Sequence, residues 1–170
     1  FNSCLRELDY TTNELYAYFI SDLLLCLNEY GIKYNKGLKN EHTLFRGLTM
    51  SYIELLLYEQ NNENIIVFPS FTSTVEDESV AKKYAGVINN SKEEINERKK
   101  NNIYSVIMKI DYECKKKSIP TCIDLDEFCQ KNESDKLFVP FTFFKIKKVE
   151  INKNNNYTII TLKVIEKEQM

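Results

Sequence analysis

Histidine and closely spaced cysteines, the usual ligands of a protein-bound zinc ion, are scarce in this sequence. It has one histidine, His42, and five cysteines, none in a Cys-x-x-Cys pair. A structural zinc site takes several such ligands at short spacings, so we expect no metal centre. An odd number of cysteines without paired spacings is typical of reduced thiols. We therefore expect an intracellular, cytoplasmic location.

A strong net charge and a long apolar run are also missing. Lysine and arginine total 23 against 25 acidic residues, which gives a formal charge of −2. So small a charge provides no general attraction for nucleic acid. The longest apolar stretch, residues 18–27, is interrupted by Ser21 and Asp22 and is too short to cross a bilayer. We expect neither a nucleic-acid partner nor insertion into a membrane.

What the sequence does contain is ordinary globular material: 43% of its 170 residues are hydrophobic and 12% are aromatic. This length suits one domain with its own core, residues 1–170. Residues 1–40 form its expected helical lead-in, because apolar side chains recur there at steps of three and four. Thr11, Thr12 and Asn13 suit an N-cap, and Gly31 suits a C-terminal stop. Residues 43–170 form the expected mixed core.

Within that core the pattern changes from helical periods to alternation. Residues 89–102 are almost wholly polar and are interpreted as a solvated surface insertion. Helices first and antiparallel strands last indicate the α+β class rather than a parallel α/β sheet. The other expected elements are strands at 43–48, 65–68, 103–111 and 137–145, a hairpin of 149–151 with 157–165, and helices at 52–58 and 77–84.

Three segments carry candidate chemistry, in the order 44–48 (LFRGL), 71–75 (FTSTV) and 133–140 (ESDKLFVP). Each alone is weak, since arginines at strand ends are usually surface residues and Ser-Thr pairs are often helix caps. Together they resemble the arginine–serine–glutamate series of the mono-ADP-ribosyltransferases, and the run 137–144 (LFVPFTFF) resembles the strand that follows that family's Glu-x-Glu turn. The resemblance covers roughly residues 44–151.

The resemblance implies a fold, a reaction and a set of site residues. The fold would be N-terminal helices followed by a mostly antiparallel split β-sandwich around an NAD cleft. The reaction would be that of an NAD(P)-protein-arginine ADP-ribosyltransferase, a glycosyltransferase that uses NAD as co-substrate and no metal. Its partner would be a protein acceptor with an exposed arginine. The residues implied for NAD binding are Arg46, Gly47, Ser73 and Thr74, and those implied for catalysis are Ser73, Glu133 and Asp135.

The implied roles follow the chemistry of breaking the nicotinamide–ribose bond. Asp135 would stabilise positive charge that develops at the anomeric carbon. Ser73 would orient that acid, and Arg46 would hold NAD's phosphates or ribose through its guanidinium fork. Glu133 would orient the arginine acceptor. Phe128 is a candidate for contacting the acceptor, although simple packing explains it equally well.

The sequence departs from the family pattern at two positions. Val75 stands where the third residue of a Ser-Thr-Ser triplet is expected, and Asp135 stands where the catalytic glutamate is expected, one methylene shorter. A displacement of the carboxylate on this scale can slow a reaction about 10²-fold. Two alternatives therefore remain open. One is a catalytically degenerate fold that acts as an NAD-binding or structural interaction module, and the other is an NAD glycohydrolase.

Overall fold

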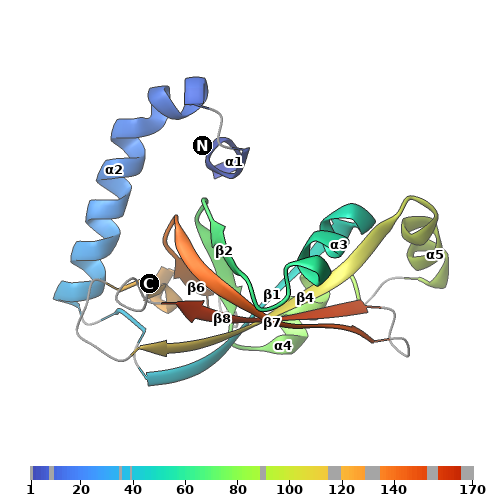
Figure 1. The fold of residues 1–170 in the computed structure, drawn as a ribbon. Coiled ribbons are helices and arrows are strands. Elements are labelled where there is room, and N and C mark those ends of the chain that lie inside the picture. The colour runs from blue at the N-terminus through green and yellow to red at the C-terminus, as the bar shows by residue number, and fades with distance from the viewer. Residues whose placement is uncertain are drawn as a thin grey trace.

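The computed structural model describes residues 2–7, 10–34, 36–38, 40–88, 91–114, 120–128, 135–152 and 157–165 (Figure 1). Two helices come first, and a sheet with shorter helices around it follows. No helix in these ranges is long and apolar enough to cross a membrane. The elements are α1 (Asn2–Glu7), α2 (Tyr10–Lys33), β1 (Asn40–Ser51), α3 (Tyr52–Gln60), β2 (Ile65–Phe68), β3 (Thr72–Val75), α4 (Glu78–Tyr84), α5 (Lys92–Lys100), β4 (Ile103–Cys114), β5 (Cys122–Asp124), a 3-10 turn η1 (Asp126–Phe128), β6 (Asp135–Phe138), β7 (Thr142–Asn152) and β8 (Tyr157–Ile165).

The strands follow the order β2-β7-β8-β4-β1-β3-β6-β5. The β4–β8 pair is parallel and the other pairs are antiparallel. This mostly antiparallel sheet, with helices both before it and between its strands in the chain, confirms the predicted α+β class. β1 pairs with β4 along its whole length but meets β3 at one register position, Phe45 opposite Val75. The sheet is therefore split between β1 and β3.

The two parts of the split sheet enclose the main core. Phe138 of β6 packs edge-on against Phe144 of β7, with 5.3 Å between ring centroids, although four strands separate β6 from β7 in the sheet order. Phe138 also packs against Tyr112 of β4 at 6.0 Å. All three rings are almost fully buried. These contacts across the sheet are those of a sandwich, as the predicted architecture requires.

The short helices begin where the sequence supplies side-chain caps. Ser51 and Glu54 form a reciprocal capping box at the start of α3, and the Asp77 side chain accepts the Ser79 N–H at the start of α4. Gly86 follows α4 with a φ of 64°, the left-handed geometry of a helix stop. The predicted helices at 52–58 and 77–84 and the predicted strand at 65–68 are confirmed.

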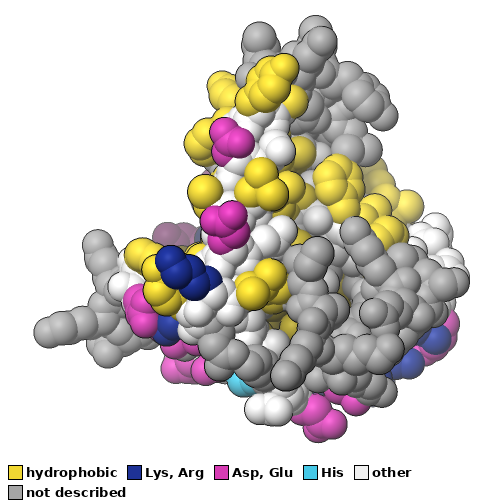
Figure 2. Space-filling model, turned by 90° about the vertical axis from the view of Figure 1, so that its left-hand side faces the viewer, with side chains coloured by type: hydrophobic (Ala, Val, Ile, Leu, Met, Phe, Trp, Pro, Cys, Tyr) yellow, Lys and Arg dark blue, Asp and Glu magenta, His cyan; other side chains and the backbone are white. Residues whose placement is uncertain are grey.

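The described part of residues 89–102 is mostly exposed, as expected of a solvated insertion, and it contains a helix, α5, because Ser91 and Glu94 form hydrogen bonds typical of a capping box. Three predictions about local structure are wrong. The predicted strand 137–145 is two strands, since the chain turns at Phe141, whose φ is 61°. Helix α2 already begins at Tyr10, so residues 11–13 lie inside it. It also runs through Gly31, where the chain lies close to Pro120, and ends at Lys33. Exposed hydrophobic side chains lie along α2, among them Tyr18, Phe19 and Leu25 (Figure 2).

Candidate active site

Three strands bring together the three segments that the sequence singles out. Arg46 lies on β1, Ser73 on β3 and Asp135 at the first position of β6. β3 pairs with β6 so that Val75 is opposite Asp135 and Ser73 is opposite Leu137. Alternation along each strand then places the side chains of Ser73 and Asp135 on the same face. Residues separated by 27 and 62 positions in the chain thus share one surface.

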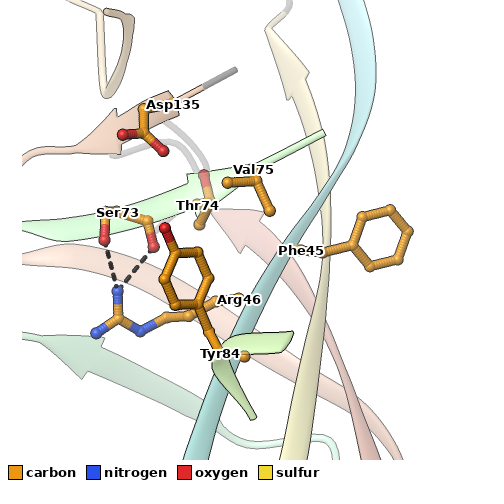
Figure 3. Close-up of a pocket in the computed structure, with 8 residues that line it drawn as sticks. Phe45, Arg46, Ser73, Thr74, Val75, Tyr84 and Asp135 are labelled. Carbon is orange, nitrogen blue, oxygen red and sulfur yellow. Dashed lines mark hydrogen bonds between the residues drawn. The ribbon is translucent and has the colours of Figure 1, made fainter. Parts of the chain in front are cut away.

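Arg46 and Ser73 are joined directly across the split. Arg46 donates from Nη1 to the Ser73 carbonyl oxygen at 2.7 Å and to Ser73 Oγ at 3.1 Å (Figure 3). Beyond the Phe45–Val75 pair the two strands do not continue as a ladder, so this side chain takes the place of a backbone partner. Burial, with a smaller effect of the Arg6 cation, lowers the pKa of Arg46. The guanidinium nevertheless stays charged at neutral pH, because the pKa of arginine starts above 12.

The alternate residues of β3 and β6 face the interior. Thr74 is buried, and its hydroxyl donates to the carbonyl oxygen of Lys136 at 2.9 Å. This bond fixes the register that sets Asp135 opposite Val75. Thr74 borders the pocket described below, but its hydroxyl holds β3 to β6. Its predicted role in binding NAD stays a prediction.

Gly47 allows a helix to lie against the strand that carries Arg46. A Cβ atom at this position would lie 1.7 Å from the carbonyl oxygen of Ala81 and 2.8 Å from the backbone nitrogen of Ala85. Both of those atoms belong to the backbone of α4 or its C-cap, which cannot move aside as a flexible side chain would. Gly47 also borders the pocket. Its close packing against α4 is enough to explain the glycine after Arg46. Its predicted role in binding NAD stays a prediction.

An open pocket of about 280 Å³ lies beside these residues. Figure 3 shows Arg46, Ser73, Tyr84 and Asp135 grouped around it, whereas the ring of Phe45 points away. The lining residues are Phe45, Arg46, Gly47, Ser73, Thr74, Val75, Tyr84 and Asp135. Five of the six predicted site residues are therefore brought together: Arg46, Gly47, Ser73, Thr74 and Asp135.

The sixth, Glu133, lies outside the described residues, as do the other positions from 129 to 134. The chain re-enters the described part at Asp135, which is partly buried. The carbonyl oxygen of Asp135 accepts a hydrogen bond from the Leu125 N–H at 3.0 Å. Asp135 therefore lies at the start of β6, directly after the segment that contains Glu133, and its backbone is held by Leu125.

Two residues near the site were not predicted to have a role there. Tyr84 is 58% exposed and borders the pocket. Its position at the end of α4, directly before Ala85 and the Gly86 stop, could have indicated this. Lys136, next to Asp135, is buried with an ion pair to Asp126. Alternation on β6 would have placed it inside.

The remaining candidates lie away from the pocket. His42 Nδ1 is 3.3 Å from a carboxylate oxygen of Glu76, so an ion pair forms when the ring is protonated. Phe128 is largely exposed and packs against the ring of Tyr30 at 5.5 Å between centroids. Among the described residues, no three His, Cys, Asp or Glu side chains are grouped so that they could hold a metal ion.

Comparison with known proteins gives a fold but no close relative. No protein-family model matches the sequence, and no curated protein matches it significantly. Among solved structures, Vis toxin, an ADP-ribosyltransferase from Vibrio splendidus, aligns with a TM-score of 0.65 and 20% identity over 98% of this chain and 66% of its own. Plx2a, an ADP-ribosyltransferase toxin from Paenibacillus larvae, aligns with a TM-score of 0.62 and 12% identity over 97% of this chain and 78% of its own.

A further structure is of Vis in complex with agmatine, with a TM-score of 0.55 and 23% identity over 76% of this chain. The chain spans between about half and two thirds of the length of the Vis structures. Identities this low indicate shared architecture, and the architecture is the one that the Arg46, Ser73 and Asp135 segments imply. This chain has the ADP-ribosyltransferase fold.

Proposed function

We propose that the chain is an NAD-dependent mono-ADP-ribosyltransferase that transfers ADP-ribose to protein arginine and releases nicotinamide. The observation that carries this proposal is the pocket itself. Arg46, Ser73 and Asp135 reach it from three different strands, and Arg46 is hydrogen-bonded to Ser73. A fold alone does not specify a reaction, but a cation, a hydroxyl and a carboxylate around one pocket suit this one.

Arg46 is suited to hold the anionic part of NAD. A guanidinium carries five N–H donors in a planar fork. Within the described part of the chain, both of its hydrogen bonds come from Nη1 and go to Ser73. Nη2 and Nε therefore keep donors for a phosphate or ribose oxygen. The bonds to Ser73 also fix the plane of the fork, which lowers the cost of ordering it when NAD binds.

Asp135 is the acid that would act on the reacting ribose. The bond between the nicotinamide nitrogen and the anomeric carbon breaks, and its electron pair leaves with nicotinamide. A bond then forms from that carbon to a guanidino nitrogen of the acceptor, which loses a proton. A fixed carboxylate stabilises the oxocarbenium-like charge that develops between these events. Glu133, two residues earlier, would orient the cationic acceptor.

The arginine acceptor has its own support. Vis, which shares the fold, has been solved with agmatine bound, and agmatine carries the guanidino group of an arginine side chain. In this chain, the residue proposed to orient the acceptor is Glu133. Its negative charge would attract a cationic guanidino group.

The test is incubation of the purified chain with NAD and agmatine, followed by mass spectrometry. We expect nicotinamide release together with agmatine that carries one ADP-ribose. The control is Asp135→Asn, which keeps the shape of the side chain and removes its charge. Nicotinamide release without modified agmatine would support a glycohydrolase. No release by a folded chain that has bound NAD would reject the transferase.

That last outcome would leave the second candidate function, an NAD-binding or structural interaction module. It is favoured by one observation, the aspartate at the position of the catalytic acid. The module predicts NAD-dependent stabilisation of the fold, since a ligand that binds only the folded state raises stability by mass action. It also predicts that no substitution at position 135 produces turnover.

A further inference from the structure

The residue after the proposed catalytic acid is a buried cation. Lys136 is 2% exposed, and its Nζ lies 2.7 Å from Asp126 Oδ1 and 3.1 Å from Asp124 Oδ1. Burial acts to lower the pKa of Lys136, but its hydrogen bonds to the two aspartates outweigh burial and raise it. For Asp124, burial acts to raise the pKa, but hydrogen bonds from the Asp126 N–H and from Lys136 lower it. Both shifts favour the charged forms of Lys136 and Asp124.

This cluster joins the two ends of the segment that carries Glu133. Residues 124–126 lie before that segment and residues 135–136 lie after it. The Leu125 N–H donates to the Asp135 carbonyl oxygen at 3.0 Å, and the Asp126 N–H donates to Asp124 Oδ1 at 2.9 Å. One backbone bond and two ion-paired hydrogen bonds thus close the base of the segment.

The first end of the segment is also tied to the N-terminal helix. Glu127 forms an ion pair with Lys36 at 2.6 Å and accepts a hydrogen bond from the Tyr30 hydroxyl at 3.1 Å. Phe128 packs against Tyr30. Because one end is held by α2 and both ends are held to each other by Lys136, the base of the segment has a fixed place against the rest of the fold.

An apolar side chain at position 136 would satisfy burial equally well, and it would avoid the cost of placing an ammonium in the interior. An apolar side chain could not form an ion pair with Asp126. Lys136 therefore links Asp126 to β6 in addition to filling space in the core. Asp126 is itself 45% exposed, so burial of that carboxylate does not explain the pair.

We propose that Lys136 is a positioning residue, which fixes the place of the Asp135 carboxylate by holding Asp124 and Asp126 against β6. The inference rests on the proposed transferase function for its effect on rate. The structural part of the inference, that Lys136 holds residues 124–126 to β6, does not depend on that function.

The variants that test it are Lys136→Met and Asp126→Asn. Lys136→Met keeps the length and removes the cation. Asp126→Asn leaves the lysine in the core and weakens one bond of the pair. The control is Lys145→Met, which removes an ion pair of similar length, 2.6 Å from Glu63, at a more exposed position on β7. Each variant is measured for NAD affinity, for turnover with NAD and agmatine, and for amide hydrogen exchange at Leu125.

We expect both variants to expose the Leu125 amide, with exchange at least about tenfold faster than in the unmodified chain and in Lys145→Met. NAD affinity should change less than about twofold, because Arg46 lies on another strand. Turnover should fall by about tenfold to 10²-fold, the scale of a displacement near 1 Å.

Unchanged Leu125 exchange in both variants would overturn the proposal. A parallel loss of NAD affinity and turnover would also overturn it, because it would indicate general loosening of the fold. If Lys136→Met does not fold, the partly exposed Asp126→Asn decides. If the unmodified chain has no turnover, the proposed function fails, and Leu125 exchange still decides whether Lys136 closes the base.

Discussion

Arg46 donates two hydrogen bonds from a single nitrogen, Nη1, to Ser73, one to the carbonyl oxygen and one to the hydroxyl. These bonds cross the position where β1 and β3 stop pairing. The arginine therefore has two tasks, to join the two parts of the sheet and to orient its own guanidinium toward the pocket. Its substitution should affect stability as well as binding, and the two effects have to be separated.

Substitution of Arg46 by lysine should remove NAD binding while the positive charge remains, because an ammonium cannot reproduce the planar fork. At 100 times its Kd, NAD would stabilise the unmodified chain by about 2.7 kcal/mol. For a domain of this size that corresponds to an increase of about 5–10 °C in Tm. We expect this increase to disappear in Arg46→Lys. Each Tm is compared with that of the same variant without NAD, and a normal increase would exclude Arg46 from the site.

Lengthening the acid should speed the reaction. Asp135→Glu restores the methylene expected from the family pattern, and nicotinamide release should rise about 10-fold to 10²-fold. Asp135→Asn should lower it by about 10² or more, since it removes the charge that stabilises the transition state. Nicotinamide is measured by chromatography. A glutamate variant slower than an active unmodified chain would show that the site is built around aspartate.

Glu133→Gln should separate transfer from hydrolysis. The amide keeps the shape of the side chain but loses the charge that attracts a guanidinium. Transfer to agmatine should fall about tenfold or more, while hydrolysis of NAD changes less than about threefold. Both rates are obtained from one reaction mixture. Equal losses would contradict the division of roles between Glu133 and Asp135.

Gly47→Ala should destabilise the fold through a clash. The added Cβ would meet backbone atoms of α4 and its C-cap, so helix and strand must separate. Overpacking of this kind costs roughly 1–3 kcal/mol. Urea unfolding measures the loss, and Thr49→Ala, an exposed position on the same strand, is the control. A stability equal to that of the control would show that α4 is not held against β1.

Stability should fall at alkaline pH through Tyr58. Burial, together with Glu54 and against the effect of Arg46, raises the pKa of this tyrosine to about 12. Its value in the unfolded chain is about 10, so between these values the unfolded state has lost a proton that the folded state keeps. The contribution to stability is complete below pH 10 and is lost as pH rises toward 12, in total about 2–3 kcal/mol. Urea unfolding of Tyr58→Phe from pH 9 to 11.5 should show a smaller loss than the unmodified chain.

The sequence predicts correctly those helices and strands whose local residue pattern matches their burial in the folded chain. Strand 65–68 and the helices near 52–58 and 77–84 lie where caps, periodicity and turn residues predict them. The break between β6 and β7 was missed because residues 137–145 are mostly apolar and resemble one strand, and because Phe141 adopts a positive φ that bulky side chains rarely accept. Helix α5 was missed although Ser91-x-x-Glu94 is a recognisable capping box.

The residues of the pocket were likewise predictable only where a local sequence pattern marks them. Arg46, Ser73 and Asp135 could be named from short motifs, because each motif is local in the sequence and resembles one of the family's. The reach of Arg46 to the Ser73 carbonyl could not be predicted, since it depends on where β1 and β3 diverge. The role of Lys136 was equally hidden, because it comes from the pairing of β6 with β5, which brings Asp124 opposite it.

The single residue pair between β1 and β3 decides how much it costs to change the width of the pocket. Separating β1 from β4 would break a ladder that pairs every residue from Asn40 to Ser51. Among the hydrogen bonds between the strands, moving β3 away from β1 breaks one residue pair and the Arg46 bonds. At about 1 kcal/mol for each hydrogen bond, this is a small fraction of the ladder's cost. For the NAD site that we propose, small rigid shifts of the two walls would let the dinucleotide enter and leave, while both walls keep their own strands paired.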